Sequence, residues 1–221
     1  MAYILNIETA TKNCSVCLAK DGIALSLQEY AGEGYAHAEK LHVFIEDALK
    51  ESGIRYKDLD AVAVSKGPGS YTGLRIGVSA AKGLCYALSL PLIAVDTLEV
   101  LARKIKITDG VILPMIDARR MEAYTAVFGP AYNKLRETKA EIIYENSFST
   151  ISGPVYLLGD GAQKYREVLK GDKFIYREDV VYPSATEMAA VSFNLYKISD
   201  TVDVAYFEPF YLKDFLISNK L

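Results

Sequence analysis

The chain has 221 residues, which is enough for one large domain or for two small ones, each with its own core. Its 25 Lys and Arg residues stand against 28 Asp and Glu residues, a formal net charge of −3. This balance argues against the chain being the main electrostatic anchor for a nucleic acid, because phosphate binding depends on dense Lys and Arg surfaces. No segment reaches the roughly 18 consecutive apolar residues of a membrane helix. The N-terminus also lacks a basic leader and a cleavage site, so we expect a cytoplasmic protein.

The first part of the chain predicts a strand and a hairpin, followed by alternating helices and strands. Residues 2–9 predict the strand, and residues 13–30 predict the hairpin with its turn at Asp21–Gly22, since Asp-Gly is a strong hairpin signal. Residues 36–52 predict a helix with one apolar stripe, which Gly53 ends. The other expected elements are a buried strand at 61–67, a helix within 67–88, a strand at 91–97 and a short helix at 98–104.

The second part predicts the same order again. Strands are expected at 111–119, 123–129 and 141–147, followed by a strand at 154–162 that enters a helix ending near residue 169. A last helix is expected at 184–197, with Ser184 and Glu187 forming a capping box. We therefore expect an α/β fold in which a mixed sheet flanked by helices is made twice. The expected domains are 1–104 and 105–221, with the last segment packing back on the first domain.

Two turns of the chain are candidates for phosphate binding. In "IETATKN", the backbone amides and the hydroxyls of Thr9 and Thr11 can cradle a phosphate, although a hairpin turn rich in Thr explains the same residues. In "GPGSYTG", Gly67, Gly69 and Gly73 come before a helix, whose positive end attracts anions. This stretch lacks the Lys-Ser/Thr pair of a Walker loop. Glycine is equally expected where a strand turns sharply into a closely packed helix, so both interpretations stay open.

The helix within 67–88 has two apolar faces. One face is aliphatic and is expected on the sheet: Leu74, Val78, Ala81, Leu84, Cys85 and Leu88. The opposite face is a stripe of small residues with one isoleucine: Ile76, Ala80, Gly83 and Ala87. Because Gly costs up to about 1 kcal/mol in a helix relative to Ala, we expect another helix to pack against this stripe. The partner is either the helix at 36–52 or another subunit. We favour another subunit, because Val43 leaves apolar surface on the far side of the first helix.

Cysteine and histidine residues give no sign of a metal or catalytic site. Cys14 and Cys17 fall on opposite faces of a strand, no second pair completes a zinc site, and Cys85 lies on a helix, so we expect three buried reduced thiols. His37 and His42 lie about 140° apart around one helix, which prevents them from sharing a metal ion. Each is expected at the surface or the cap of the helix. No nucleophile–base pair is evident, so a protease is discounted.

Five segments resemble the TsaB family, also called YeaZ: "ILNIETATKNCSVCL", "HAEKLHVFIEDAL", "SKGPGSYTGLRIGVSAAKGLCYAL", "IDARRMEAYTAVF" and "FEPFYLK". The resemblance covers nearly the whole chain, and the Gly67–Leu88 segment is highly specific to the group. It implies the actin/Hsp70-like fold (the ASKHA fold) of duplicated RNase-H-like domains. It also implies a role in the N6-threonylcarbamoylation of a tRNA adenosine next to the anticodon.

The resemblance further implies that this chain is not the catalyst. The larger relative, TsaD, carries a metal-binding H-x-x-x-H, and the corresponding positions here are Thr97 and Leu101. Ala118 and Arg119 also stand where the superfamily usually places glycine in a phosphate loop. No cofactor is therefore required, and ATP or ADP is expected to bind weakly at a vestigial site. Its expected residues are Glu8, Thr9, Thr11, Asp117, Gly159, Asp160 and Gly161.

The partners implied by the resemblance are a TsaD-like paralogue, bound as a heterodimer, and a TsaE-like ATPase. The isolated chain is expected to form a homodimer and to contact tRNA only indirectly, with no membrane involved. The expected dimer interface lies on the two helices at 36–52 and 67–88: Ala36, His37, Lys40, Val43, Ile76, Ser79, Ala80, Gly83 and Ala87. The alternative function is a small nucleotide-dependent enzyme, an ATPase or kinase of the actin-like superfamily.

Overall fold

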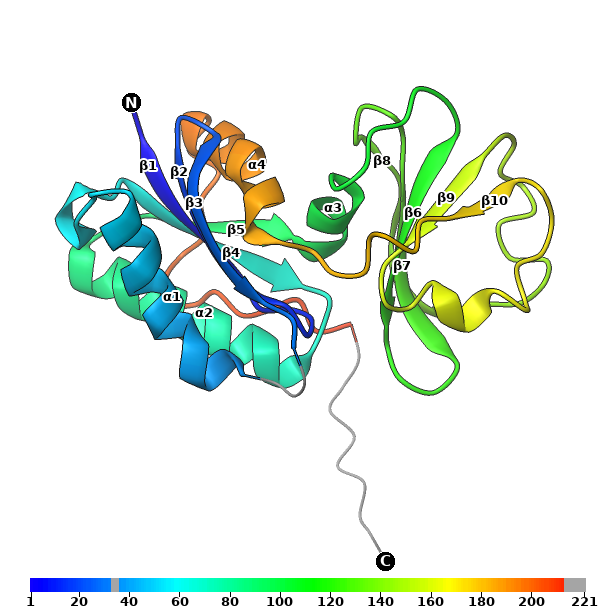
Figure 1. The fold of residues 1–221 in the computed structure, drawn as a ribbon, viewed down its shortest axis with the longest axis horizontal. Coiled ribbons are helices and arrows are strands. Elements are labelled where there is room, and N and C mark those ends of the chain that lie inside the picture. Colours follow the sequence, from blue (N-terminus) through cyan, green and yellow to red (C-terminus); the bar gives the residue numbers. More distant parts are fainter. Residues whose placement is uncertain (33–35, 213–221) are drawn as a thin grey trace, which may run out of the picture.

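The computed structural model describes residues 1–32 and 36–212, and these residues form two five-stranded mixed sheets (Figure 1). In the first sheet the strand order is β3-β2-β1-β4-β5, antiparallel up to β1 and parallel from β1 to β5. Asp21 and Gly22 turn the predicted hairpin with φ angles of 50° and 83°. The strands of this sheet are β1 (Tyr3–Glu8), β2 (Cys14–Lys20), β3 (Ile23–Tyr30), β4 (Ala61–Gly67) and β5 (Leu92–Asp96).

The second sheet repeats the first strand for strand. Its order is β10-β9-β6-β7-β8, with β7 and β8 antiparallel to their neighbours and β9 and β10 parallel to theirs. The expected duplication of a mixed sheet is therefore confirmed. The strands are β6 (Val111–Asp117), β7 (Glu122–Phe128), β8 (Lys134–Ile142), β9 (Val155–Leu158) and β10 (Phe174–Tyr176).

The helices are distributed unevenly between the two sheets. In Figure 1, α1 (His37–Glu51) and α2 (Tyr71–Leu88) cover one face of the first sheet, and α4 (Ala185–Lys197) covers the other. The short helix α3 (Thr97–Ala102) lies between the sheets and shares a core cluster with residues of β6. The first sheet is thus a complete three-layer sandwich, although its last helix comes from the end of the chain.

Three predictions for the second half are wrong in detail. Strand β8 ends where the strand predicted at 141–147 was expected to begin, because this edge strand carries charged side chains instead of an aliphatic pattern. The helix expected to end near residue 169 is a single 3-10 turn at Gln163–Tyr165. The capping box is absent as well: the hydroxyl of Ser184 donates to Glu29 Oε2, 2.8 Å away, because α4 packs on the first sheet.

The chain after α4 stays with the first half. The Val202 amide donates to the carbonyl of Leu92 (2.9 Å), and the Phe210 amide donates to the carbonyl of Lys66 (2.7 Å). Val204 and Phe207 pack between these two points against the core cluster of the first sheet. The domain boundary near residue 104 stays a prediction. Among the described residues, no helix is long and apolar enough to cross a membrane.

Candidate interaction site on helices α1 and α2

Helix α2 is anchored by its buried face and by well-defined ends. The Ser70 hydroxyl accepts the Gly73 amide (3.3 Å) at the N-terminus, and Ser89 ends the helix in the left-handed conformation. The face on the sheet carries the aliphatic side chains that the sequence predicts, and four of the six are fully buried: Leu74, Val78, Ala81 and Cys85. Helix α2 is therefore a rigid support for whatever its other faces contact.

The opposite face of α2 is open. A methyl group added at Gly83 would meet no atom within 4 Å. Ser79 and Ala87 are exposed beside it, while Ile76 and Ala80 are half-buried. On the neighbouring helix α1, Val43 is 52% exposed. We call this surface the α1–α2 outer face, made of Ala36, Lys40, Val43, Ile76, Ser79, Ala80, Gly83 and Ala87.

Helix α1 accounts for only part of the small-residue stripe. Ile76 and Ala80 pack partly against the core cluster to which α1 contributes Leu41 and Ile45. Gly83 and Ala87 lie beyond that contact and stay exposed. Packing against α1 therefore explains Ile76 and Ala80. It leaves Gly83 and Ala87 without a packing partner among the described residues.

His37 is not a surface residue, so the sequence interpretation of its position is wrong. Its side chain is 1% exposed, and Nε2 lies 2.7 Å from the carbonyl oxygen of Thr11. Although His37 belongs to the predicted interface, it ties the start of α1 to the β1–β2 turn and offers almost no surface to a partner. His42, one and a half turns further along the helix, is exposed.

The C-terminal segment lies along another edge of α2, in keeping with the expectation that the last segment packs back on the first domain. Lys82 Nζ donates to the carbonyls of Ala205 (3.1 Å) and Phe207 (3.0 Å). Arg75 Nε donates to the hydroxyl of Tyr211 at 3.3 Å. Lys82 and Arg75 on the polar edge of α2 are thus bonded within the chain, whereas the α1–α2 outer face and Tyr86, which is 86% exposed, remain open. The apolar spacing of Val202, Val204 and Phe207 is the sequence signal that could have revealed this contact.

The glycines before and within α2 serve close packing against the β1–β2 turn. A methyl group added at Gly69 would lie 2.2 Å from the carbonyl oxygen of Ala10, and one at Gly73 would lie 2.1 Å from that of Thr9. At Gly77 it would lie 2.1 Å from Thr9 Oγ1. These positions tolerate only glycine. Of the two interpretations of "GPGSYTG", the structure therefore supports the sharp turn into a closely packed helix.

The β1–β2 turn, the first candidate phosphate site, is sealed under α2. Thr9 Oγ1 donates to the carbonyl of Gly73 (2.8 Å), and the Ser70 amide donates to the carbonyl of Ala10 (2.6 Å). Glu8 and Thr9 are fully buried, and Thr11 is 4% exposed. Phosphate binding by these side chains stays a prediction, and it requires α2 to move away from the turn.

Glu8 is the most perturbed acid of this region. Its Oε1 accepts the Ala10 amide (2.6 Å) and the Ser65 hydroxyl (3.0 Å), whereas Oε2 has no partner. Burial raises the pKa of this carboxyl to about 7, and the two hydrogen bonds only partly counter that effect. Glu8 is therefore partly protonated near neutral pH.

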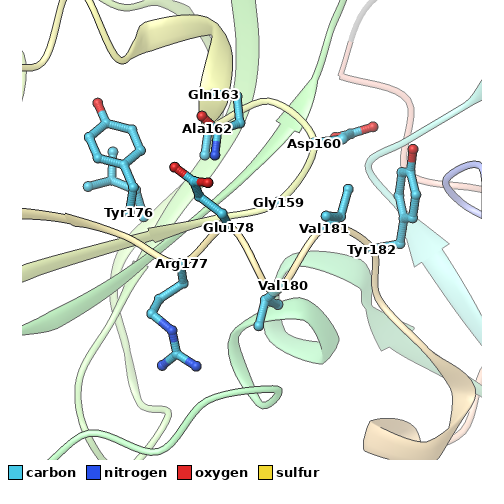
Figure 2. A pocket seen from close by; sticks show the side chains of 11 residues that line it. Gly159, Asp160, Ala162, Gln163, Tyr176, Arg177, Glu178, Val180, Val181 and Tyr182 are labelled. Carbon is cyan, nitrogen blue, oxygen red and sulfur yellow. The ribbon is translucent and has the colours of Figure 1, made fainter.

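The second half contains a small pocket at the other candidate nucleotide residues. It has a volume of about 230 Å³ and is lined by residues of the β9 end and the chain after β10, among them Gly159, Asp160, Gln163, Arg177, Glu178 and Tyr182. Figure 2 shows Gln163 and Glu178 gathered on one side and Asp160 with Tyr182 on the other. Burial raises the pKa of Asp160, whose Oδ1 accepts the Asp117 amide (3.0 Å).

This pocket brings together only part of the predicted nucleotide set. Gly159 and Asp160 line it, whereas Asp117 is exposed and forms an ion pair with Lys164 (2.7 Å). Gly161 packs against the backbone of β6, where an added methyl group would lie 2.9 Å from the carbonyl carbon of Ile116. The lining carries two carboxylates, from Asp160 and Glu178, and also Arg177, and Glu178 forms an ion pair with Arg166, so the charges of the lining neither favour nor exclude a phosphate. Nucleotide binding here stays a prediction.

Thr97 and Leu101, which the resemblance matches with the H-x-x-x-H of TsaD, are both buried. The Thr97 hydroxyl accepts the Gly67 amide (3.1 Å), which links the start of α3 to the end of β4. Leu101 lies in the core cluster between the two sheets. In residues 1–32 and 36–212, no group of three His, Cys, Asp or Glu side chains is placed to hold a metal ion.

The three cysteines are free and buried, as predicted. Burial raises the pKa of the thiols of Cys14 and Cys85 to about 11 and that of Cys17 to about 12. Because the thiolate is the reactive form, these side chains are chemically inert at neutral pH.

Solved structures place this fold in a known class. "YeaZ from Pseudomonas aeruginosa" superposes with a TM-score of 0.85 at 25% identity, over 96% of this chain and all of that chain. The activator of the 2-hydroxyisocaproyl-CoA dehydratase from Clostridium difficile, solved with bound ADPNP, superposes with a TM-score of 0.52 at 10% identity. The chain is therefore an actin-like α/β protein with two RNase-H-like halves.

Sequence comparisons identify the family within this class. The family model "TsaD: tRNA N6-adenosine threonylcarbamoyltransferase" matches residues 33–214. The Escherichia coli "tRNA threonylcarbamoyladenosine biosynthesis protein TsaB" is 33% identical over 99% of this chain and 97% of its own length. A Paracoccus denitrificans "tRNA N6-adenosine threonylcarbamoyltransferase" is 44% identical over 51% of this chain. The chain belongs to the TsaB family of tRNA threonylcarbamoyladenosine biosynthesis proteins, which confirms the resemblance found in the sequence.

Proposed function

We propose that this chain is a non-catalytic scaffold of the tRNA threonylcarbamoyladenosine machinery. It pairs through the α1–α2 outer face with a TsaD-type paralogue, in the cytoplasm, and the pair recruits a TsaE-like ATPase. The observation that supports this role most directly is the open space over Gly83 on a helix whose opposite face is buried against the sheet.

The small residues of the α1–α2 outer face suit a helix as the occupant. Gly83 weakens α2 by up to about 1 kcal/mol relative to Ala, and no contact within the described chain offsets this cost. Small side chains allow two helix backbones to approach closely, as in the tighter classes of helix packing. An occupant that buries Val43, Ala80 and Ala87 at the same time gains apolar contact as well.

A TsaD-type paralogue suits this face because the two proteins are related in sequence. The match to a TsaD family model extends over residues 33–214, which include both α1 and α2. Two related subunits can pair through equivalent helices about a pseudo-two-fold axis, as identical subunits do in a homodimer. The isolated chain uses the same surface to form a homodimer until the paralogue replaces the second copy.

A non-catalytic role is supported by the residues at the two positions that the resemblance matches with the metal-binding histidines of TsaD. Thr97 and Leu101 offer no imidazole for a metal ion, and both side chains are buried. The net charge of −3 favours indirect contact with tRNA, through the partner subunit. We assign the transfer step to the TsaD-type subunit.

The alternative, a small nucleotide-dependent enzyme, rests on the pocket beside Gly159 and Asp160. Weak binding of ATP or ADP there is compatible with the scaffold role, whereas turnover is not. Titration calorimetry with ATP and magnesium separates the two functions. We expect weak binding or none and no release of phosphate; micromolar binding with turnover by the isolated chain would establish the enzyme instead.

The pairing is tested by long charged side chains placed on the α1–α2 outer face. Ala80→Arg and Gly83→Arg are expected to abolish the heterodimer with the TsaD-type paralogue in light scattering, because an arginine cannot be desolvated between two close helices. Ala190→Arg, at an exposed position of α4, is the matched control and is expected to leave the heterodimer intact. A heterodimer that persists in both outer-face variants would contradict the proposal.

A further inference from the structure

The four edges of the two sheets differ in how they are protected against pairing with another strand. An edge strand exposes unpaired N–H and C=O groups, and proteins protect such edges by charge, by cover or by shortness. Strand β5 is covered, because the Val202 amide donates to the carbonyl of Leu92 (2.9 Å) and the two residues form an antiparallel bridge. Strand β8 has Lys, Arg or Glu at five of its nine positions, and β10 is three residues long. Three of the four edges are therefore protected.

The fourth edge, on β3, is long and carries almost no charge. The strand has eight residues, and its first six, 23–28, are uncharged. Three apolar side chains at alternate positions are exposed: Ile23 (71%), Leu25 (47%) and Leu27 (37%). In the part of the chain that the structure describes, no strand or loop pairs with the outer edge of β3. A register shift opposite Leu25 bends the strand, but neither charge nor cover accompanies it.

Strand β3 is held in place from both faces of the sheet. The Ser26 hydroxyl donates to the carbonyl of Ala48 on α1 (2.9 Å). On the other face, Glu29 Oε2 accepts the hydroxyl of Ser184 at the N-terminus of α4 (2.8 Å). A methyl group added at Gly22, just before the strand, would lie 3.2 Å from the ring of Phe193 on α4. An edge that is already ordered loses little conformational freedom when another strand pairs with it.

We propose that β3 pairs with β3 of a second copy of this chain, antiparallel, about a two-fold axis through the middle of the strand. An uncharged edge carries nothing that repels its own kind, and the two-fold axis places the apolar row of one copy beside the same row of the other. Glu29 lies near the end of the strand, so the two carboxylates stay at opposite ends of the pair. Pairing through sheet edges stops at two copies, because the other three edges are protected.

This contact is additional to the α1–α2 outer face, and it does not depend on the proposed function. The outer face lies on the layer of helices over the sheet, whereas the edge of β3 lies in the plane of the sheet. The two surfaces approach each other where Lys40 Nζ lies 4.5 Å from the centre of the Tyr30 ring. The variants that test the pairing are therefore placed at Leu25 and Leu27, away from Tyr30.

Sedimentation equilibrium of the full chain with Gly83→Arg tests the pairing, because this variant blocks the α1–α2 outer face. We expect Gly83→Arg to form a dimer. Leu25→Lys and Leu27→Lys, each added to Gly83→Arg, are expected to raise the dissociation constant at least tenfold, because like charges meet across the axis. Leu135→Lys, at a similarly exposed leucine on the protected edge strand β8, is the matched control and should leave the dimer unchanged. A Gly83→Arg chain that is monomeric at every concentration, or a dimer that withstands both lysines, would overturn the proposal.

Charge reversal tests whether the same strand is used on both copies. Leu25→Lys and Leu25→Glu, each in the Gly83→Arg chain, are expected to dimerise poorly alone and to pair with each other when mixed, because opposite charges then meet near the axis. If the mixture stays monomeric while Gly83→Arg alone dimerises, the two-fold pairing of β3 is refuted. The effect of Gly83→Arg on the heterodimer with the paralogue is a separate measurement, so the failure of one proposal is distinguishable from the failure of the other.

Discussion

Two groups of small residues on helix α2 have opposite surroundings. Before and within its N-terminal end, Gly69, Gly73 and Gly77 stand against the β1–β2 turn so closely that a single added methyl group would overlap it. Less than two turns beyond Gly77, an addition at Gly83 meets no atom within 4 Å. The same residue type thus serves the internal packing of the fold at one end of the stretch and leaves an uncovered surface at the other.

The difference shows that glycine alone does not distinguish a packing position from an interaction surface. The first group explains why the chain turns at this point and how the first half holds together. The second group has no explanation within the described chain, and it supports the proposal that a foreign helix covers the α1–α2 outer face. Substitutions at the N-terminal glycines should therefore reduce the stability of the fold, whereas substitutions at Gly83 should mainly affect association with a partner.

The largest effect is expected at the N-terminal end. Gly73→Ala places a methyl group 2.1 Å from the backbone oxygen of Thr9, so α2 must shift away from the turn. We expect a loss of about 3 kcal/mol or more in the free energy of unfolding, measured by urea denaturation. A variant as stable as the natural chain would show that the close approach of α2 is not required.

The next effect is a pH dependence that arises from Glu8, under the same end of the helix. Its pKa is about 7 in the folded chain and 4.5 in the unfolded chain, so between these values the folded state holds the extra proton. Stability is therefore expected to fall as pH rises from 4.5 to 7, by about 3 kcal/mol.

Glu8→Gln, which cannot ionise, removes this dependence and provides the check. Urea denaturation at pH 5 and at pH 8 should show similar stability for Glu8→Gln and a clear loss at pH 8 for the natural chain. An identical loss in both proteins would mean that Glu8 does not carry the effect.

A smaller effect is expected at the edge of α2 that the C-terminal segment occupies. Lys82→Met removes two hydrogen bonds to the carbonyls of Ala205 and Phe207 and keeps the aliphatic stem. We expect a loss of about 1 kcal/mol in thermal unfolding, since the ammonium group is only half-buried. The affinity for the paralogue should not change, because this edge is separate from the α1–α2 outer face. A large change in that affinity would show that this edge of α2 also belongs to the interface.

The smallest effect on stability, with the opposite sign, is expected at Gly83. Gly83→Ala has room for its methyl group and should stabilise the chain by up to about 1 kcal/mol, because alanine favours the helix. The same methyl group should weaken association where two helices approach closely. A variant that is destabilised in thermal unfolding would show that Gly83 is a packing position like Gly73.

Much of the first half could be predicted from the sequence, because its elements follow strong local rules. The Asp21–Gly22 hairpin and the aliphatic face of α2 fall where turn chemistry and periodicity place them. The location of β8 could not be predicted in the same way, since an exposed edge strand carries no apolar alternation. Ser184 also departs from its local rule, because its hydroxyl has a partner 155 residues away.

The sequence predicted where the small-residue stripe of the candidate site lies. What it did not predict are contacts between segments that are far apart in the sequence. The sequence indicated the open stripe on α2, yet it gave no sign that His37 is buried against the carbonyl of Thr11. The sequence led us to expect that the last segment packs back on the first domain, but it did not specify the hydrogen bonds that this segment makes with Lys82 and Arg75. Contacts between distant segments decide these cases, and neither periodicity nor capping rules report on them.

Protection of a single thiol on α2 is the most direct test of the α1–α2 outer face. The natural cysteines are buried with raised pKa values, so Ser79→Cys introduces the one reactive thiol of the described chain. At submicromolar concentration we expect rapid alkylation of Ser79→Cys and at least tenfold slower alkylation when the TsaD-type paralogue is saturating. An Ala190→Cys control should react equally fast in both conditions. If Ser79→Cys reacts at the same rate with and without the paralogue, the α1–α2 outer face is not the surface at which the two proteins meet.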